Sequence, residues 1–146
     1  MPLYLEDLTP GMVFTSATHA LDAEQIKKFA QEYDPQPFHL DDAAAKPTMF
    51  GGLAASGWHT AALSMKLLVG ALPLAGGIIG GAGELAWPKP TRPGDVLQLV
   101  AEIIEVTPSR SKPERGMAVI RSETRNQHGD LVQVFTSKVI LLRRPV

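Results

Sequence analysis

The fold is decided by one stretch of the sequence, GWHTAALSMKLLVGAL, which runs from Gly57 to Leu72. Ten of its 16 residues are apolar, and the polar ones do not form a full opposite face. A helix that is apolar on most sides is buried on most sides. The stretch therefore predicts a central helix that neighbouring elements cover over most of its surface.

Strands are expected on both sides of this helix in the sequence. Residues 12–19 are rich in strand-forming side chains and follow the turn pair Pro10-Gly11. After the helix, strands are expected at Gly83–Trp87, Val96–Val106, Met117–Arg125 and Leu131–Leu142. In the second of these, every other residue from Leu97 to Ile103 is apolar and shares one face. One long apolar helix followed by antiparallel strands predicts an α+β fold, with a sheet wrapped around the helix.

A shorter helix is expected between the first strand and the central helix. Asp22 is a good N-cap, with Gln25 as its reciprocal partner, and apolar residues recur at helical spacing from Ile26 to Tyr33. Pro35 and Pro37 end this helix, because proline pushes the residue before it out of helical geometry. Since proline also fixes φ and removes a donor, we expect residues 34–41 to be stiff and non-helical.

Composition excludes several classes of function. The chain has 146 residues, no cysteine, and 14 Lys and Arg against 15 Asp and Glu. This length suits one domain covering residues 1–146. Near-neutral charge argues against nucleic acid or an anionic membrane as the main partner. Without cysteine there is no thiolate nucleophile or sulfur-ligated metal, and no cluster of His, Asp and Glu has the spacing of a metal site.

The longest uncharged stretch, residues 67–83, does not resemble a membrane span because it contains a proline and six glycines. The N-terminus lacks the pattern of a secretory signal, so we expect a cytoplasmic protein. The second half of the uncharged stretch, Gly76–Gly83, is interpreted either as a mobile lid or as a turn into the next strand.

The residues best suited to catalysis lie around two prolines, in the segment Tyr33–Asp41. Asp34 and His39 form a plausible acid/base pair, because proton transfer needs both groups within reach of one region of a substrate. Five residues apart, they meet only if the chain folds back on itself. The alternative is a helix-ending turn, in which Asp34 caps backbone amides and His39 packs at the surface.

Two segments resemble the MaoC-like dehydratases, the group that includes the (R)-specific enoyl-CoA hydratases. They are AQEYDPQPFHLD at residues 30–41 and FGGLAASG at residues 50–57, and the turn Pro90–Asp95 resembles the one those proteins carry before a long strand. The family pattern of Asp, two residues, Pro, one residue and His matches Asp34, Pro37 and His39. The resemblance implies a single hot-dog fold, with this loop lying over the active site.

The resemblance also implies a reaction. In that family the Asp and the His hold the water that adds to, or leaves from, the β-carbon of an acyl thioester. Asp34 and His39 are therefore the expected catalytic pair, and Asp34 acts as a base if burial raises its pKa. Gly57 is the expected oxyanion donor, because its N–H lies at a helix N-terminus where developing enolate charge is stabilised. A coenzyme A or acyl-carrier-protein thioester is then the substrate, and no cofactor or metal is required.

Three further residues are expected to line the substrate site: Ser56, Trp58 and Phe50. For Trp58 and Phe50, packing in the core is the alternative. Many hydratases of this group have Asn where this chain has Gln36, and His where it has Ser56. Both replacements keep hydrogen-bonding ability, so they bear on substrate choice more than on chemistry. A serine that orients the site in some members corresponds to Met65, with Ser64 beside it, and we assign no role there. His59 could be a second base, but in a buried helix it is expected to be packed and hydrogen-bonded.

Two other functions remain open at this point. Hot-dog proteins also include acyl-CoA thioesterases, and the unusual Gln36 and Ser56 fit a non-catalytic acyl-CoA-binding subunit. Three basic residues in a polar loop, Arg110, Lys112 and Arg115, fit either a solvated turn or contacts to coenzyme A phosphates. Because an open sheet has edges that must be covered, a homodimer or higher homo-oligomer is expected. The sequence does not predict the length of the acyl chain, the stereochemistry of the product or the pathway.

Overall fold

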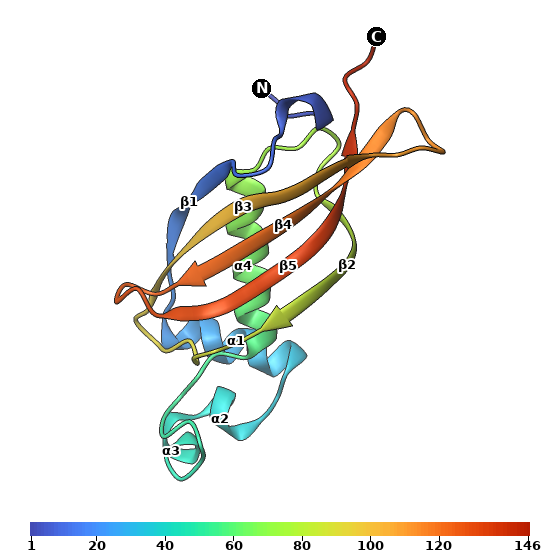
Figure 1. Ribbon diagram of the computed structural model, residues 1–146. Coiled ribbons are helices and arrows are strands. Elements are labelled where there is room, and N and C mark those ends of the chain that lie inside the picture. The colour runs from blue at the N-terminus through green and yellow to red at the C-terminus, as the bar shows by residue number, and fades with distance from the viewer.

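A single antiparallel sheet curves around one long helix in the computed structural model, which describes residues 1–146 (Figure 1). The five strands lie in the order β1-β3-β4-β5-β2, and every neighbouring pair is antiparallel. Their bounds are β1 (Val13–Ala20), β2 (Ile79–Ala86), β3 (Val96–Pro108), β4 (Arg115–Arg125) and β5 (Leu131–Leu142). This is the α+β hot-dog arrangement that the resemblance implies.

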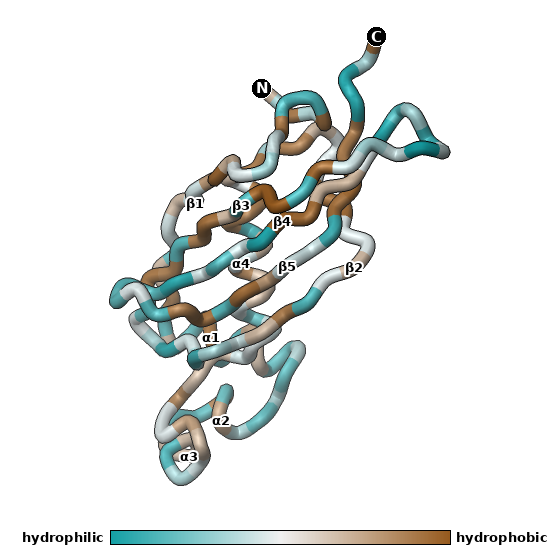
Figure 2. Tube along the Cα trace, in the orientation of Figure 1, coloured by the Kyte–Doolittle hydropathy of each residue, from teal (hydrophilic) through white to brown (hydrophobic).

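The helix inside the sheet is α4 (Gly57–Ala71). Its N-cap is Ser56, whose hydroxyl accepts the N–H of Trp58 at 3.2 Å. The core forms where α4 meets the inner face of the sheet, and Figure 2 shows apolar stretches along the strands and a hydrophilic tip on the β3–β4 hairpin. The core includes Leu67 and Leu68 of α4, Leu97, Leu99, Ala101 and Ile103 of β3, Ala118 and Ile120 of β4, and Val139 and Leu141 of β5. The alternation predicted for β3 is confirmed.

One face of α4 is open to solvent, so the expectation of a helix buried on most sides is wrong. Trp58 is 61% exposed, Val69 54% and Met65 39%. The sheet covers α4 incompletely, and these exposed apolar residues lie along the flank of α4 where that cover ends. A patch of this kind on a soluble domain marks a contact surface.

Three short helices precede α4, and they lie together below the sheet in Figure 1. They are α1 (Ala23–Tyr33), α2 (Pro37–Leu40) and α3 (Asp42–Ala45), while a 3-10 turn, η1 (Leu5–Asp7), lies near the N-terminus. Asp22 caps α1 as predicted, but the Gln25 side chain hydrogen-bonds His19 at 2.8 Å instead of completing a reciprocal cap. Residues 34–41 are not wholly non-helical, because Pro37 occupies the first turn of α2, where its missing N–H has no cost.

The glycine-rich stretch after α4 is a turn followed by an edge strand. Gly76 and Gly77 have φ of 78° and 83°, which places them in the left-handed region. Strand β2 begins at Ile79, four residues before the expected start, so most of this segment is neither lid nor turn. Gly83 is required in β2 because a Cβ there would lie 2.5 Å from Cε1 of Phe135. No helix of the structure is long and apolar enough to cross a membrane.

Candidate active site

Asp34 and His39 meet because the chain reverses direction between them. Asp34 ends α1, where its N–H donates to the Ala30 carbonyl at 2.9 Å. His39 is the third residue of α2, and its Nε2 lies 3.3 Å from Oδ2 of Asp34. Both side chains are largely buried, with 4% of His39 and 16% of Asp34 exposed. The two residues that the sequence pairs are therefore in contact, and α2 supplies the fold-back that this contact requires.

The imidazole of His39 is held in one orientation by its other nitrogen. Nδ1 lies 2.7 Å from the carbonyl oxygen of Ala54, and a carbonyl can only accept, so Nδ1 carries a proton. In the neutral ring Nε2 then carries the lone pair, and it faces Asp34. His39 can thus take a proton at Nε2 and become an imidazolium paired with the carboxylate.

The carboxyl group of Asp34 stays ionised at neutral pH. Burial raises the pKa of Asp34, but hydrogen bonds from the Ser56 hydroxyl and the Gln36 amide, together with the charge of His39, leave it below its ordinary value. The amide of Gln36 donates to Oδ1 at 2.5 Å. The condition under which Asp34 would act as the base is not met, because hydrogen bonds outweigh burial. The carboxylate is suited to orient a water molecule and to stabilise an imidazolium.

Gly57 is the first residue of α4, and its N–H makes no hydrogen bond within the protein. The backbone N–H groups of the next three residues all donate to Ser56: that of Trp58 to the hydroxyl, and those of His59 and Thr60 to the carbonyl. The N–H of Gly57 has no such acceptor. Free N–H groups at a helix N-terminus favour negative charge nearby. Glycine allows this close approach, because a Cβ at this position would lie 2.7 Å from Cε2 of the Trp87 ring and either the ring or the helix start would have to shift.

His39 and Gly57 line the same pocket, which has a volume of about 390 Å³. Phe50 also lines it, as expected, and it is held there because Arg92 donates to its carbonyl and to those of Gly52 and Leu53. Ser56 does not line this pocket, since it is fully buried, but its hydroxyl contributes to the lowered pKa of Asp34.

Trp87 and Lys89 also belong to this pocket, and sequence reasoning missed both. Trp87 follows β2 directly, and Lys89 lies in the proline-rich turn after it. Pairing of β2 with β5 brings this turn beside α4. A tryptophan at the end of a strand was the only local signal.

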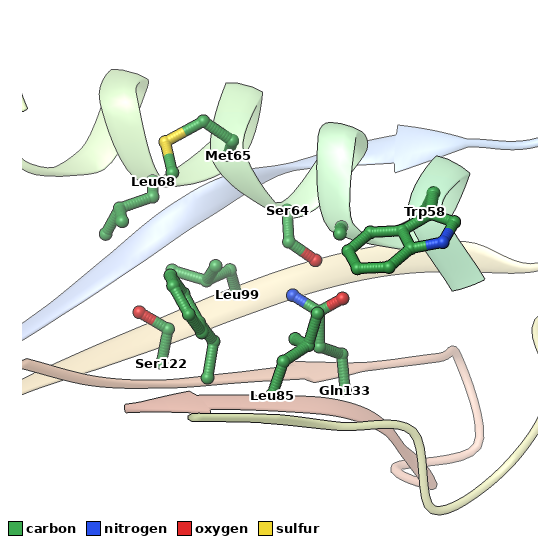
Figure 3. Close-up of a pocket in the computed structure, with 10 residues that line it drawn as sticks. Trp58, Ser64, Met65, Leu68, Leu85, Leu99, Ser122 and Gln133 are labelled. Atoms are coloured by element: carbon green, nitrogen blue, oxygen red, sulfur yellow. The ribbon is translucent and has the colours of Figure 1, made fainter. Parts of the chain in front are cut away.

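A second pocket of about 240 Å³ lies beside the first, between α4 and the sheet (Figure 3). Seven of its ten lining residues are hydrophobic, among them Trp58, Leu68 and Leu99. Trp58 and Trp87 stand edge to face with ring centroids 5.2 Å apart, so this pair lies between the two pockets. Trp58 therefore lines the apolar pocket and not the one that contains His39.

His59 is packed as expected, but the hydrogen bond expected with that packing is missing. It is 7% exposed, its ring stacks on Phe29 with centroids 4.5 Å apart, and its Nδ1 has no hydrogen-bond partner. Burial lowers the pKa of His59 below its ordinary value of 6.5, and the charge of His19 lowers it further. Lys28 and Glu32 line the same shallow depression on α1.

His59 should make the protein less stable in mild acid. The pKa of His59 is lower in the folded than in the unfolded state. Its contribution to the free energy of unfolding is therefore fully present above about pH 6.5 and is lost as the pH falls from there through the folded-state pKa. His59→Phe keeps the stack on Phe29 and removes the titration. We expect the urea midpoint of the wild type to drop more than that of His59→Phe between about pH 7 and pH 5. Parallel curves for the two proteins would contradict this role.

The basic loop residues lie far from the paired Asp34 and His39 within one chain. Lys112 and Arg115 line a groove at the β3–β4 hairpin, at the end of the sheet opposite α2 and α3 in Figure 1. A solvated turn is thus the interpretation that fits the single chain. The structure also contains no group of three or more His, Cys, Asp or Glu side chains that could hold a metal ion.

Comparisons with known proteins identify the family and the fold. The family model for the MaoC like domain matches residues 7–125. The crystal structure of a MaoC-like dehydratase from Rhodospirillum rubrum is 56% identical, covers 99% of both chains and superposes with a TM-score of 0.97. A 3-hydroxybutyryl-CoA dehydratase of Methylorubrum extorquens is 31% identical over 111 residues, which are 75% of this chain and 69% of that protein. The R-hydratase PhaJ1 of Pseudomonas aeruginosa is 25% identical over 98% of this chain and 88% of its own, with a TM-score of 0.78. The chain therefore belongs to the MaoC-like domain family.

Proposed function

We propose that the protein is a hydro-lyase that reversibly adds water to the double bond of an enoyl thioester, giving a 3-hydroxyacyl thioester. The observation that carries the proposal is the contact between Asp34 and His39, 3.3 Å apart, beside the free N–H of Gly57. A fixed acid/base group and a fixed oxyanion donor are the two elements that this reaction needs.

In this proposal Asp34, His39 and Gly57 each have a separate role in the reaction. The Asp34 carboxylate accepts a hydrogen bond from the reacting water and directs its oxygen at the β-carbon. His39 Nε2 takes the water proton as the carbon–oxygen bond forms, and the π electrons move to the thioester oxygen, where the Gly57 N–H stabilises the enolate. The imidazolium then returns the proton to the α-carbon on the same face. Atoms balance without a metal or a prosthetic group, since the thioester itself acidifies the α-carbon.

The two pockets suit the two parts of such a substrate. The pocket of His39 and Gly57 contains polar groups and Lys89, which suits the thioester and the start of its carrier arm. The apolar pocket beyond Trp58 and Trp87 suits the acyl chain. The names of the dehydratase and R-hydratase relatives support coenzyme A thioesters and the (R) product as the first choices to test.

The test is an assay with crotonyl-CoA that follows both the enoyl absorbance and the release of free thiol. We expect the enoyl absorbance to fall without thiol release. Thiol release with the enoyl band unchanged would instead indicate a thioesterase. Tight binding without turnover of any enoyl chain would indicate a non-catalytic acyl-CoA-binding subunit.

We also propose that two copies of the chain pair through the edge strand β2 and the open face of α4. Every residue of β2 except Leu85 is exposed, and one edge of the strand has no hydrogen-bonded neighbour. Trp58 and Met65 share the apolar pocket with Leu85, so the open face of α4 lies next to this edge. A second copy would extend the sheet and cover both features.

Disruption of the open α4 face should produce monomers. We expect light scattering to give the wild type twice the 15.7 kDa mass of one chain. Val69→Glu places a charge on the open face and should reduce the mass to one chain. Lys66→Glu is the matched control, because Lys66 is also exposed on α4 but lines a depression beside β1. A monomeric wild type, or a dimeric Val69→Glu, would contradict this interface.

A further inference from the structure

The apolar pocket between α4 and the sheet contains one buried hydroxyl without a partner. Ser122 of β4 is 2% exposed, and its Oγ makes no hydrogen bond in the protein. It lines the pocket, and in Figure 3 its hydroxyl projects from the strand toward α4. Buried polar side chains are rarely left unpaired, because they lose their water without gaining a partner. An orphan hydroxyl in a pocket therefore points to a ligand that supplies the partner.

A second free donor lies on the same wall. Gln133 of β5 is 2% exposed, and its Oε1 accepts the indole N–H of Trp87 at 3.0 Å. The indole can only donate, so this bond assigns which end of the amide is oxygen. The amide nitrogen is thereby turned away from Trp87, and in Figure 3 it lies on the side of Ser64. No hydrogen bond of this nitrogen is found within the protein.

The other serine in this pocket already has a hydrogen-bond partner. Ser64 and Thr124 hydrogen-bond one another at 2.7 Å, which satisfies the polar pair between α4 and β4. Further along the inner face of β4, Ile120 and Ala118 are apolar and belong to the core. Ser122 and Gln133 thus stand out as two free donors on one wall of a pocket whose other surfaces are mainly hydrophobic.

The polar groups of this pocket indicate which class of acyl chain it binds. The free hydroxyl of Ser122 and the free amide nitrogen of Gln133 can each donate a hydrogen bond to an oxygen atom. No charged side chain lines the pocket, so a carboxylate would be buried without a counter-ion, and a neutral oxygen is favoured. We propose that the acyl pocket selects chains carrying a neutral hydroxyl, ether or carbonyl oxygen, held by the Ser122 hydroxyl, with the Gln133 amide as a second donor further along the same wall. This inference rests on the proposed function, which places the acyl chain in this pocket.

The test compares matched ligands by binding, so it does not depend on catalysis. Saturated acyl-CoA thioesters of medium chain length are paired with analogues in which one methylene, at successive positions, is replaced by an ether oxygen. Titration calorimetry then gives Kd for each pair. We expect at least one ether analogue to bind about tenfold more tightly than its all-carbon partner, the value of one good hydrogen bond. Ser122→Ala should reduce that ratio to about one.

A matched control separates the hydroxyl from a general effect of the substitution. Ser137 is a buried serine on the inner face of β5 that does not line the pocket, so Ser137→Ala should keep the wild-type ratio. All-carbon chains that bind as tightly as every ether analogue, or a ratio that Ser122→Ala leaves intact, would overturn the inference. Either result would leave the proposed function standing if crotonyl-CoA is hydrated. A preference for ether analogues without any hydration would retain the inference about the pocket and reject the reaction.

Discussion

Asp34→Asn is expected to lower kcat/KM for enoyl-CoA hydration by about 10²- to 10⁴-fold, the usual contribution of a positioned acid/base group. Asparagine keeps the shape of the side chain but removes the negative charge. That charge orients the water and stabilises the imidazolium at His39, whose Nε2 lies 3.3 Å from the carboxylate. Steady-state rates with crotonyl-CoA, together with circular dichroism to establish folding, measure the effect.

The matched control is the same substitution at Asp41. This residue also loses a negative charge in the same loop, and its side chain caps α3 by accepting the N–H of Ala44 at 3.0 Å. Asparagine caps helices as well as aspartate does, so Asp41→Asn should stay folded and active. Equal activity in Asp34→Asn and Asp41→Asn would show that the carboxylate of Asp34 takes no part in the reaction.

Gly57→Ala keeps the backbone N–H but is expected to displace it from the thioester oxygen, and so to reduce kcat/KM by about 10²- to 10³-fold, which is typical when one oxyanion donor no longer acts. The added Cβ would lie 2.7 Å from the ring of Trp87, so either the ring or the start of α4 must move. The indole N–H of Trp87 donates a hydrogen bond to Gln133, and this bond opposes movement of the ring. The overpacking should also lower the free energy of unfolding by about 1–3 kcal/mol, measurable by urea denaturation.

Gly70→Ala provides the control within the same helix. A Cβ at Gly70 meets nothing within 4 Å, and alanine is favoured over glycine inside a helix by about 0.5–1 kcal/mol. We therefore expect Gly70→Ala to be slightly more stable than the wild type and fully active. If Gly57→Ala behaved in the same way, the close approach of Trp87 to Gly57 would be rejected, together with the expected displacement of the N–H at this position.

The parts of the fold that depend on local patterns follow from the sequence. The alternation from Leu97 to Ile103 predicts the buried face of β3, and Asp22 predicts the start of α1. The turn at α2 also had a signal, because proline is favoured in the first turn of a helix and Pro37 occupies that position. Reading Pro37 only as a helix breaker concealed the turn that brings His39 to Asp34.

Other features depend on contacts between distant segments, and no local pattern contains them. The net lowering of the Asp34 pKa comes partly from Ser56, which reaches it only because the chain before α4 packs behind the loop. The position of Trp87 beside Gly57 depends on the pairing of β2 with β5. The open face of α4 could not be told from a buried one, because an apolar residue suits a core and an interface equally well.

If Asp34 and His39 add water to the double bond of an enoyl thioester, with Gly57 stabilising the enolate, the oxygen of that water must end on the β-carbon of the product. Incubation with crotonyl-CoA in water labelled with heavy oxygen, followed by mass spectrometry, shows where that oxygen goes. We predict intact 3-hydroxybutyryl-CoA with the label on the β-carbon, formed by the wild type and nearly absent with Asp34→Asn. Label in a free carboxylic acid with release of coenzyme A, or unlabelled and unchanged crotonyl-CoA, would contradict the account.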